Sequence, residues 1–451
     1  MFERINLSTL VMQILRHRGY LGALSSGYLL MLASILVQIV LVPLYLKTFG
    51  QYQFGVLMVL LSLVNFAVIG IAWMSGGALR LLGEYAGLGN ETAFLRAYGL
   101  IKTIYVGYGL IVATLLCVMG LSADQILFSG GTIEDVSSAR ATLLLTGVYL
   151  VVFYAVAIDR IALTARKRQG AANIAQLLGI VAFAAAVAPW LFNEWAMPGV
   201  MACQIFGAFV SNVLTWFFLK QDLIGLKMRL PSKSDTDILR RLGGRAGAGF
   251  FLHGALVLAL LADTAFVGWL GGAKTAAEFY LVWKIAEVIV QLIWKLPEPL
   301  APYFVQMDAR GEHTSLTRIA RLGYVLVAGV SLLMGIFYAL FGPALATLWV
   351  GKENVPNSPL GYALAGGAIF WLGISRLPIV FAGARVALGP LNLAGGIELL
   401  GKLVITLLLF PRLGFVAILL GINLVHLLGV SLLYFRLLPG PIVIAPRHAG
   451  E

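Results

Sequence analysis

The sequence predicts an all-α polytopic membrane protein, with about twelve transmembrane helices in two parallel six-helix bundles around a central cavity. Three observations carry this prediction. Of the 451 residues, 60% are hydrophobic and 12% are charged, whereas a soluble domain has roughly 25% charged residues. The mean hydropathy is +0.93 over the whole chain. The apolar residues form long continuous runs, and the chain repeats itself at about half its length.

Each helical span requires about 20 consecutive apolar residues. Backbone groups in hydrocarbon must bond internally, and the apolar runs do not alternate as the strands of a membrane β-barrel do, so helices are predicted. The predicted spans are residues 20–44, 53–77, 101–122, 141–163, 171–192, 198–219, 246–270, 277–303, 322–341, 360–383, 391–410 and 415–437.

The segments outside the spans are short. Residues 1–19 are expected to form a cytoplasmic interfacial helix rather than a removable signal peptide, because no small-residue cleavage site follows an apolar core. The two lobes are predicted at 20–220 and 246–437. A basic cytoplasmic linker at 221–245 would join them, and a cytoplasmic tail at 438–451 would follow.

The distribution of lysine and arginine predicts the orientation of the spans. With both termini in the cytoplasm, 23 of the 32 basic residues lie in cytoplasmic segments or at the cytoplasmic ends of spans, and five lie in outside loops. The net charge of +12 then reflects topology, so no nucleic-acid partner is expected. The predicted location is the cytoplasmic (inner) membrane, which the chain would cross many times.

No motif of a catalytic site is present. The outside loops are at most about 20 residues long, and the sequence has no HExxH, GxSxG or P-loop motif. The histidines show no metal-ligand spacing. We therefore expect a protein that is not an enzyme, with no catalytic residues and no metal site.

The internal repeat is visible in two short segments. GNETAFLR at 89–96 follows the second predicted span, and GEHTSLTR at 311–318 follows the eighth, so the repeat is about half as long as the chain. Because six spans is an even number, both halves should have the same orientation in the membrane. Parallel repeats of this kind are typical of transporters with a site between two bundles.

Ionisable groups at membrane depth are the most informative residues, because they are costly there and usually functional or paired. They lie in the second half, at spacings that place those of span 8 on one helical face and those of span 11 on another. The ionisable candidates are Asp263, Lys284, Glu287, Arg376, Glu398 and Lys402, and Gln291 is a polar candidate on the same face of span 8. At the offset between the two repeated segments, Glu287 corresponds to Asn65, which is a further polar candidate.

Depth along the spans predicts three ion pairs. These are Asp263 with Lys284, Glu287 with Lys402, and Arg376 with Glu398. Two interpretations remain open: the pairs line a hydrated central cavity, or they pin helices together without contacting a substrate.

Two longer stretches resemble a known family. PLYLKTFGQYQFGVLMVLLSLVNFAVIG (43–70) has the Gly-x-x-x-aromatic-Gly start of the second span, here Gly50 to Gly55. EFYLVWKIAEVIVQLIWKLPEPLAPYFVQMDARGEHTSLTRIARLG (278–323) is similar to the eighth span of that family. The resemblance is to polysaccharide and O-antigen flippases (Wzx-type), the polysaccharide transporter branch of the multidrug/oligosaccharidyl-lipid/polysaccharide exporter superfamily.

This resemblance implies a flippase that moves a polyprenyl-diphosphate-linked oligosaccharide from the inner to the outer leaflet for polysaccharide biosynthesis. Transport would proceed by alternating access, driven by an H⁺ or Na⁺ gradient, with no other cofactor. Lys284, Arg376 and Lys402 are the candidate contacts for the diphosphate. Asp263, Glu287 and Glu398 are the candidate coupling acids, and Gln291 and Asn65 are candidate polar groups of the cavity.

Two alternatives remain open at this stage. One is a multidrug or small-molecule cation antiporter of the same superfamily, and the other is a non-transporting membrane subunit of a glycan-synthesis complex. The expected partners are the lipid-linked substrate, membrane lipid, and polysaccharide polymerase or glycosyltransferase machinery. The chain itself is expected to be a monomer.

Overall fold

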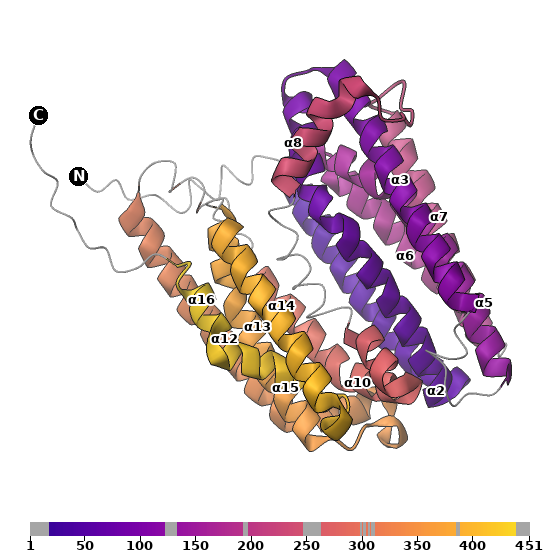
Figure 1. The fold of residues 1–451 in the computed structure, drawn as a ribbon, viewed down its shortest axis with the longest axis vertical. Helices are drawn as coiled ribbons and strands as arrows, with labels where there is room; N and C mark the ends of the chain where they lie inside the picture. The colour runs from indigo at the N-terminus through magenta and orange to yellow at the C-terminus, as the bar shows by residue number, and fades with distance from the viewer. Residues whose placement is uncertain are drawn as a thin grey trace, which may run out of the picture. The chain divides into compact units, whose positions relative to one another are not determined.

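The computed structural model describes residues 18–121, 133–192, 197–246, 263–297, 300, 304, 307, 312–384 and 388–438. The predicted interfacial helix and the predicted tail lie almost entirely outside these residues. Within them all regular structure is helical, which confirms the predicted fold class. The chain divides into two compact units, Met1–Gly247 and Ala248–Glu451. Figure 1 shows each unit as a bundle of long helices packed along their lengths.

The first unit contains long apolar helices and the short helices of a linker. The predicted spans at 20–44 and 53–77 are two arms of α2, which is kinked at Gly50, where φ is 70° and ψ is 174°. Glycine is the residue that adopts this conformation without strain. The helices of this unit are α2 (Arg18–Gly87), α3 (Glu91–Leu121), α5 (Ile133–Ala165), α6 (Gln169–Phe192), α7 (Met197–Lys220), η1 (Lys233–Asp235) and α8 (Thr236–Ala246).

The second unit has the same kind of kink and an interrupted last span. α10 bends at Gly272, where φ is 79° and ψ is 175°. The predicted span at 246–270 falls mostly on residues outside the described part of the chain. The helices are α10 (Asp263–Lys295), α12 (His313–Val350), η5 (Lys352–Asn354), α13 (Pro359–Ala384), α14 (Leu388–Leu413), α15 (Val416–Val425), the π-helical turn η6 (His426–Val430) and α16 (Ser431–Phe435).

The backbone repeats where the sequence does. The separation along the chain from Gly50 to Gly272 equals that from Glu91, the first residue of α3, to His313, the first residue of α12. It is also the separation of the segments 89–96 and 311–318. Later helices keep a nearly equal separation along the chain. The separation from the first residue of α6 to that of α14 is the same as the separation from the first residue of α7 to that of α15. The offset between two short sequence segments is therefore an offset between whole helices.

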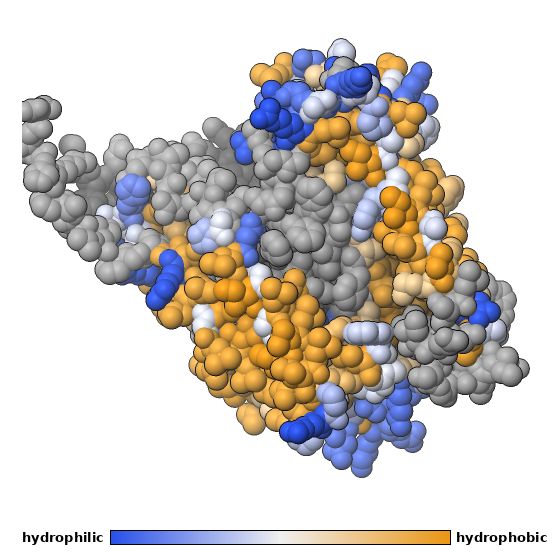
Figure 2. Space-filling view, viewed as in Figure 1, coloured by the Kyte–Doolittle hydropathy of each residue, from blue (hydrophilic) through white to orange (hydrophobic). Residues whose placement is uncertain are grey.

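Apolar side chains cover the outsides of both units. Nine stretches of the described residues are long and apolar enough to cross a membrane. On α12, Leu326 and Leu333 have exposed fractions of 63% and 66%, and Figure 2 shows hydrophobic side chains over the flanks of each unit. A water-soluble protein does not expose apolar surface of this extent. The chain is therefore a multi-pass membrane protein.

The basic segment after α7 is anchored to the first unit. Asp235 accepts hydrogen bonds from Arg96 Nε at 2.7 Å and from the Ser232 hydroxyl at 2.7 Å. These hydrogen bonds lower the pKa of Asp235 to about 2, and the bond from Ser232 has the largest effect. The Arg229 amide also donates to the Gly99 carbonyl at 3.1 Å. The segment between α7 and α8 thus packs against α3.

Candidate functional site

A buried ion pair joins α10 to α14. Lys402 Nζ lies 2.7 Å from Asp263 Oδ1, and both residues have exposed fractions of 3%. The second carboxylate oxygen of Asp263 is buried and has no hydrogen-bond partner among the described residues. An ion pair this deep in an apolar bundle is costly to break from one side, because the remaining charge is left uncompensated.

A second ion pair lies within α10. Lys284 Nζ contacts both carboxylate oxygens of Glu287 at 3.1 and 3.0 Å, and Gln291 Nε2 donates to Glu287 Oε1 at 2.8 Å. The Lys284 ammonium also lies 5.7 Å from the centre of the Tyr280 ring. The polar face predicted for span 8 is therefore present, and it forms a continuous chain of contacts along one helix.

The predicted partners of Asp263 and Lys402 are wrong. Depth alone paired Asp263 with Lys284 and Glu287 with Lys402. Lys284 and Glu287 instead pair with each other, because residues three apart on a helix are neighbours. Asp263 and Lys402 are then left to pair across the two helices.

The predicted pair of Arg376 with Glu398 is also wrong, since Glu398 contacts the last span. It accepts a hydrogen bond from the Tyr434 hydroxyl at 2.7 Å, and its other oxygen lies 3.3 Å from His426 Nε2. The Arg376 guanidinium lies over the Trp294 ring, 4.9 Å from its centre. Glu398 faces α15–α16 rather than α13, which the sequence does not reveal.

The first unit has an ionic cluster that the sequence interpretation missed. Lys102 Nζ lies 3.0 Å from both oxygens of Asp159, and the Tyr98 hydroxyl donates to the same carboxylate at 2.5 Å. Asp159 is buried between α3 and α5. The sequence placed the ionisable candidates in the second half, so this pair of the first unit was not predicted. The sequence signal that could have revealed this cluster is the spacing of Tyr98 and Lys102, which lie four residues apart near the start of a predicted span.

The remaining predicted site residue is Asn65. It lies in α2, but its side chain is outside the part of the chain that the structure describes. The described residues also contain no group of three or more His, Cys, Asp or Glu side chains that could hold a metal ion.

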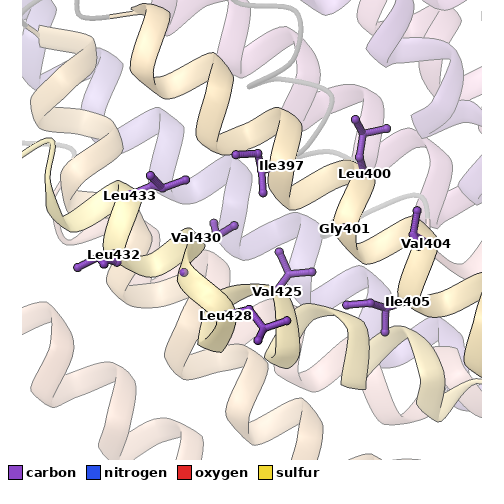
Figure 3. Close-up of a pocket in the computed structure, with 11 residues that line it drawn as sticks. Ile397, Leu400, Gly401, Val404, Ile405, Val425, Leu428, Val430, Leu432 and Leu433 are labelled. Carbon is purple, nitrogen blue, oxygen red and sulfur yellow. The ribbon is translucent and has the colours of Figure 1, made fainter.

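An apolar groove runs along the outside of the second unit. It has a volume of about 620 Å³ and lies between α14 and the last span, over the turn η6 (Figure 3). Its walls include Ile397, Leu400 and Val404 from α14, and Leu428 and Leu432 from the last span. The lining is aliphatic, so the groove suits a hydrocarbon chain.

The lysine–carboxylate pairs can bind protons at their carboxylates and anions at their ammonium groups. Each buried lysine is neutralised by a carboxylate, so an anion would have to displace that carboxylate to reach the ammonium group. Protonating the carboxylate would remove its charge and release the ammonium group for an anion. The pairs are thus chemically able to link proton binding to anion binding.

Comparisons with solved structures find this fold in two kinds of protein. The lipid II flippase MurJ, in an inward closed conformation, matches with a TM-score of 0.68 at 13% sequence identity, over 92% of this chain and 88% of that one. An inward-facing multidrug resistance MATE family transporter of the MOP superfamily matches with a TM-score of 0.68 at 12% identity, over 92% of this chain and 98% of that one.

A mutant of the Vibrio cholerae MATE transporter VcmN gives a TM-score of 0.60 at 15% identity, over 92% of this chain and 96% of that one. No protein-family model and no curated protein sequence matches the chain. At these identities the comparisons establish a common fold.

Proposed function

We propose, from a fold shared with a lipid II flippase and with MATE transporters, that this chain is a flippase for a polyprenyl-diphosphate-linked oligosaccharide. It would carry the lipid-linked sugar from the inner to the outer leaflet of the cytoplasmic membrane, with both termini in the cytoplasm, for polysaccharide biosynthesis. The observation that carries the proposal is the two lysine–carboxylate contacts in the second unit, the buried Lys402–Asp263 pair and the part-buried Lys284–Glu287 pair.

The buried cations favour an anionic substrate. Ammonium and guanidinium groups form strong hydrogen bonds to phosphate oxygens, and Lys284, Arg376 and Lys402 supply such groups within the apolar bundle. Charged groups at membrane depth are retained where a pathway or a substrate requires them. A diphosphate bound to a saccharide is a substrate of that chemistry.

The proposed mechanism is alternating access coupled to an ion gradient. Binding of H⁺ at Asp263 or Glu287 would neutralise the carboxylate and free its lysine for the diphosphate, and loss of the ion would restore the pair and expel the head group. Glu398 is the third coupling acid. The kinks at Gly50 and Gly272 are places where long helices can change direction as the lobes rearrange.

The lipid tail would remain in the hydrocarbon during transport. The aliphatic groove between α14 and the last span offers a surface for it on the outside of the second unit. Polymerase and glycosyltransferase machinery would supply and consume the lipid-linked sugar on the two sides of the membrane.

Exchange in liposomes tests the proposal. Purified protein should move a fluorescent polyprenyl-diphosphate oligosaccharide between leaflets, and Lys284→Gln or Lys402→Gln should slow that exchange by about tenfold or more, the equivalent of one charged hydrogen bond. Lys352→Gln, at an exposed lysine of η5, is the matched control. Unchanged exchange in both buried-lysine variants, at normal expression, would refute the diphosphate contact.

A multidrug cation antiporter is the second candidate. It is favoured by the neutralisation of each buried lysine, which leaves the paired groups without a net positive field. Efflux of a cationic dye from the same liposomes, with no exchange of the lipid-linked sugar, would select it. Absence of both activities would support a non-transporting subunit.

A further inference from the structure

The last span of the second unit contains a buried cluster around His426. Its Nε2 lies 3.3 Å from Glu398 Oε1, and its Nδ1 lies 3.1 Å from Ser431 Oγ. Tyr434 donates its hydroxyl hydrogen to the other oxygen of Glu398 at 2.7 Å. Glu398, His426 and Tyr434 have exposed fractions of 6%, 1% and 1%. The cluster is thus enclosed by protein.

The π-helical turn η6 lets His426 and Tyr434 reach the same carboxylate. They lie eight residues apart, and eight residues of a regular α-helix turn about 80° beyond two full turns. A π-helical turn absorbs one extra residue, so the two side chains lie as residues seven apart would, within about 20° of each other. Gly429, with φ of 141°, lies in this turn. Turns of this kind are frequent at functional sites.

The cluster belongs to a larger charge network. Lys402 follows Glu398 by one turn of α14 and is bound to Asp263. Counting the described residues alone, with a neutral imidazole the carboxylates of Asp263 and Glu398 and the ammonium of Lys402 leave a net charge of −1. With a protonated imidazole the network is neutral. Because an uncompensated buried charge is costly, the network is suited to holding one additional proton on the Glu398–His426 pair.

The other ionisable side chains of the neighbouring helix α13 pack against other residues. Arg376 lies over Trp294, and the Tyr362 ring lies 6.1 Å from the Tyr338 ring. Trp371 of the same helix stacks on His426, with ring centres 6.1 Å apart and planes 8° apart. α13 therefore presents an aromatic ring to the imidazole.

The neighbours of His426 can satisfy both of its charge states. A serine hydroxyl can donate or accept a hydrogen bond. Ser431 can therefore donate to a neutral Nδ1 and accept from a protonated one, while Nε2–H points to Glu398 in both states. Uptake and loss of the proton require only that the Ser431 hydroxyl rotate.

The Glu398 carboxylate is less suited to a metal cation. Both of its oxygens already face hydrogen-bond donors, the Tyr434 hydroxyl and the His426 ring. Sodium sites in transporters use several oxygen ligands, including carbonyls of unwound helices. Histidine, in contrast, is the side chain whose charge changes nearest neutral pH.

We propose that the Glu398–His426 pair is a proton-binding site of the second unit and that the ion coupled to transport is H⁺. This inference rests on the proposed function and names its coupling ion. His426 takes up a proton from water on one side of the membrane. It returns the proton to water on the other side after the lobes rearrange, with no change in oxidation state.

Fluorescence of Trp371 tests the site without transport, because a protonated imidazole quenches a stacked indole. The difference between the emission of the full-length protein and that of its Trp371→Phe variant should fall reversibly as the pH is lowered. His426→Gln should abolish this change. His313→Gln, at an exposed histidine that begins α12, should preserve it. A wild-type difference that stays constant with pH overturns the proposal, whether or not the variants fold.

Transport in sodium-free liposomes tests the coupling. For one proton per cycle, a difference of about one pH unit across the membrane should bias the direction of exchange by about tenfold. Glu398→Gln and His426→Gln should remove the bias, whereas His313→Gln should retain it. Retention of the bias in His426→Gln, or a bias produced only by a sodium gradient, overturns the proposal. A normal Trp371 titration in a protein that exchanges no lipid-linked sugar would refute the proposed function and leave the proton site standing.

Discussion

Gly272 adopts almost the same backbone conformation as Gly50, the glycine at the corresponding position of the first unit. Their φ angles are 79° and 70°, and their ψ angles are 175° and 174°. Each glycine joins two helical arms, in one unit the arms of α2 and in the other those of α10. Duplication of a helical unit explains why two separate units bend at corresponding residues.

Alanine at either position should destabilise the protein to a similar extent. The conformation at Gly50 and Gly272 is nearly exclusive to glycine, and a side chain there is strained by about 1–3 kcal/mol. No neighbouring atom lies within 4 Å of the added Cβ at either glycine, so backbone strain alone should set the loss. Thermal unfolding in detergent measures the effect.

Gly83→Ala and Gly329→Ala are the controls for this comparison. Both glycines lie within helices at negative φ, with open space around the added Cβ, so alanine should leave stability unchanged or raise it slightly. Equal melting temperatures for Gly50→Ala and Gly83→Ala would show that the kink is not needed for folding.

The Asp263–Lys402 pair should show strong coupling in a double-mutant cycle. Lys402→Met or Asp263→Leu alone leaves a buried charge and should cost about 3–5 kcal/mol of stability. The double variant, which leaves two apolar side chains, should recover most of that loss. Unfolding of all four proteins in detergent gives the coupling energy, and additive losses would contradict the prediction.

The same double variant separates a structural pair from a substrate-binding pair. If the two residues only pin α10 to α14, the stable double variant should exchange lipid-linked sugar at the wild-type rate. If Lys402 contacts the diphosphate, exchange should fall by about tenfold or more while stability is retained. We expect the second result.

Docking of the linker on the first unit should weaken in acid. The pKa of Asp235 is about 2 when docked, against 3.8 ordinarily. A depressed carboxyl pKa stabilises docking fully above the ordinary value, and this stabilisation is lost as the pH falls through the docked value. A spin label at Ile224, an exposed residue of this segment, should gain mobility between about pH 4 and pH 2. Asp235→Asn should make it mobile at neutral pH, and a label that stays immobile in that variant would refute the docking role.

The fold could be predicted from the sequence because the features that determine each helix lie within its own segment of the chain. Apolar runs and the repeated segments at 89–96 and 311–318 predicted helices, their order and the two-fold repeat. The interruption at Gly429 was not predicted, because a π-helical turn leaves the apolar run unbroken. The arms at Gly50 and Gly272 were predicted as separate spans, which is how the structure divides them.

The pairing of charges was predictable only within a helix. Lys284 and Glu287 share a face by spacing alone, so their contact was available from the sequence. The contacts of Glu398 with His426 and of Lys102 with Asp159 depend on how helices are rotated against each other. Side chains of similar depth on different helices offer many pairings, and helix packing selects among them.

Removing one residue from the π-helical turn should leave the last span correctly oriented. Deleting Leu428, which has an exposed fraction of 78%, would convert η6 to an α-helical turn. His426 and Tyr434 would then be seven residues apart and still within about 20° of each other. Leu400 is another exposed leucine, between Glu398 and Lys402, and its deletion would rotate one of these residues against the other by about 100°.

These two deletions each remove a leucine from the same outer surface. A difference between the two variants in yield or melting temperature therefore reports on the helical register of the remaining side chains. The Leu428 deletion should yield folded protein with a melting temperature close to that of the wild type and a preserved Trp371 titration. The Leu400 deletion should break either the His426 contact or the Asp263 contact, and should lower the yield and the melting temperature. If the Leu428 deletion is the more damaging of the two, the extra residue in η6 is itself required for the stability of the second unit.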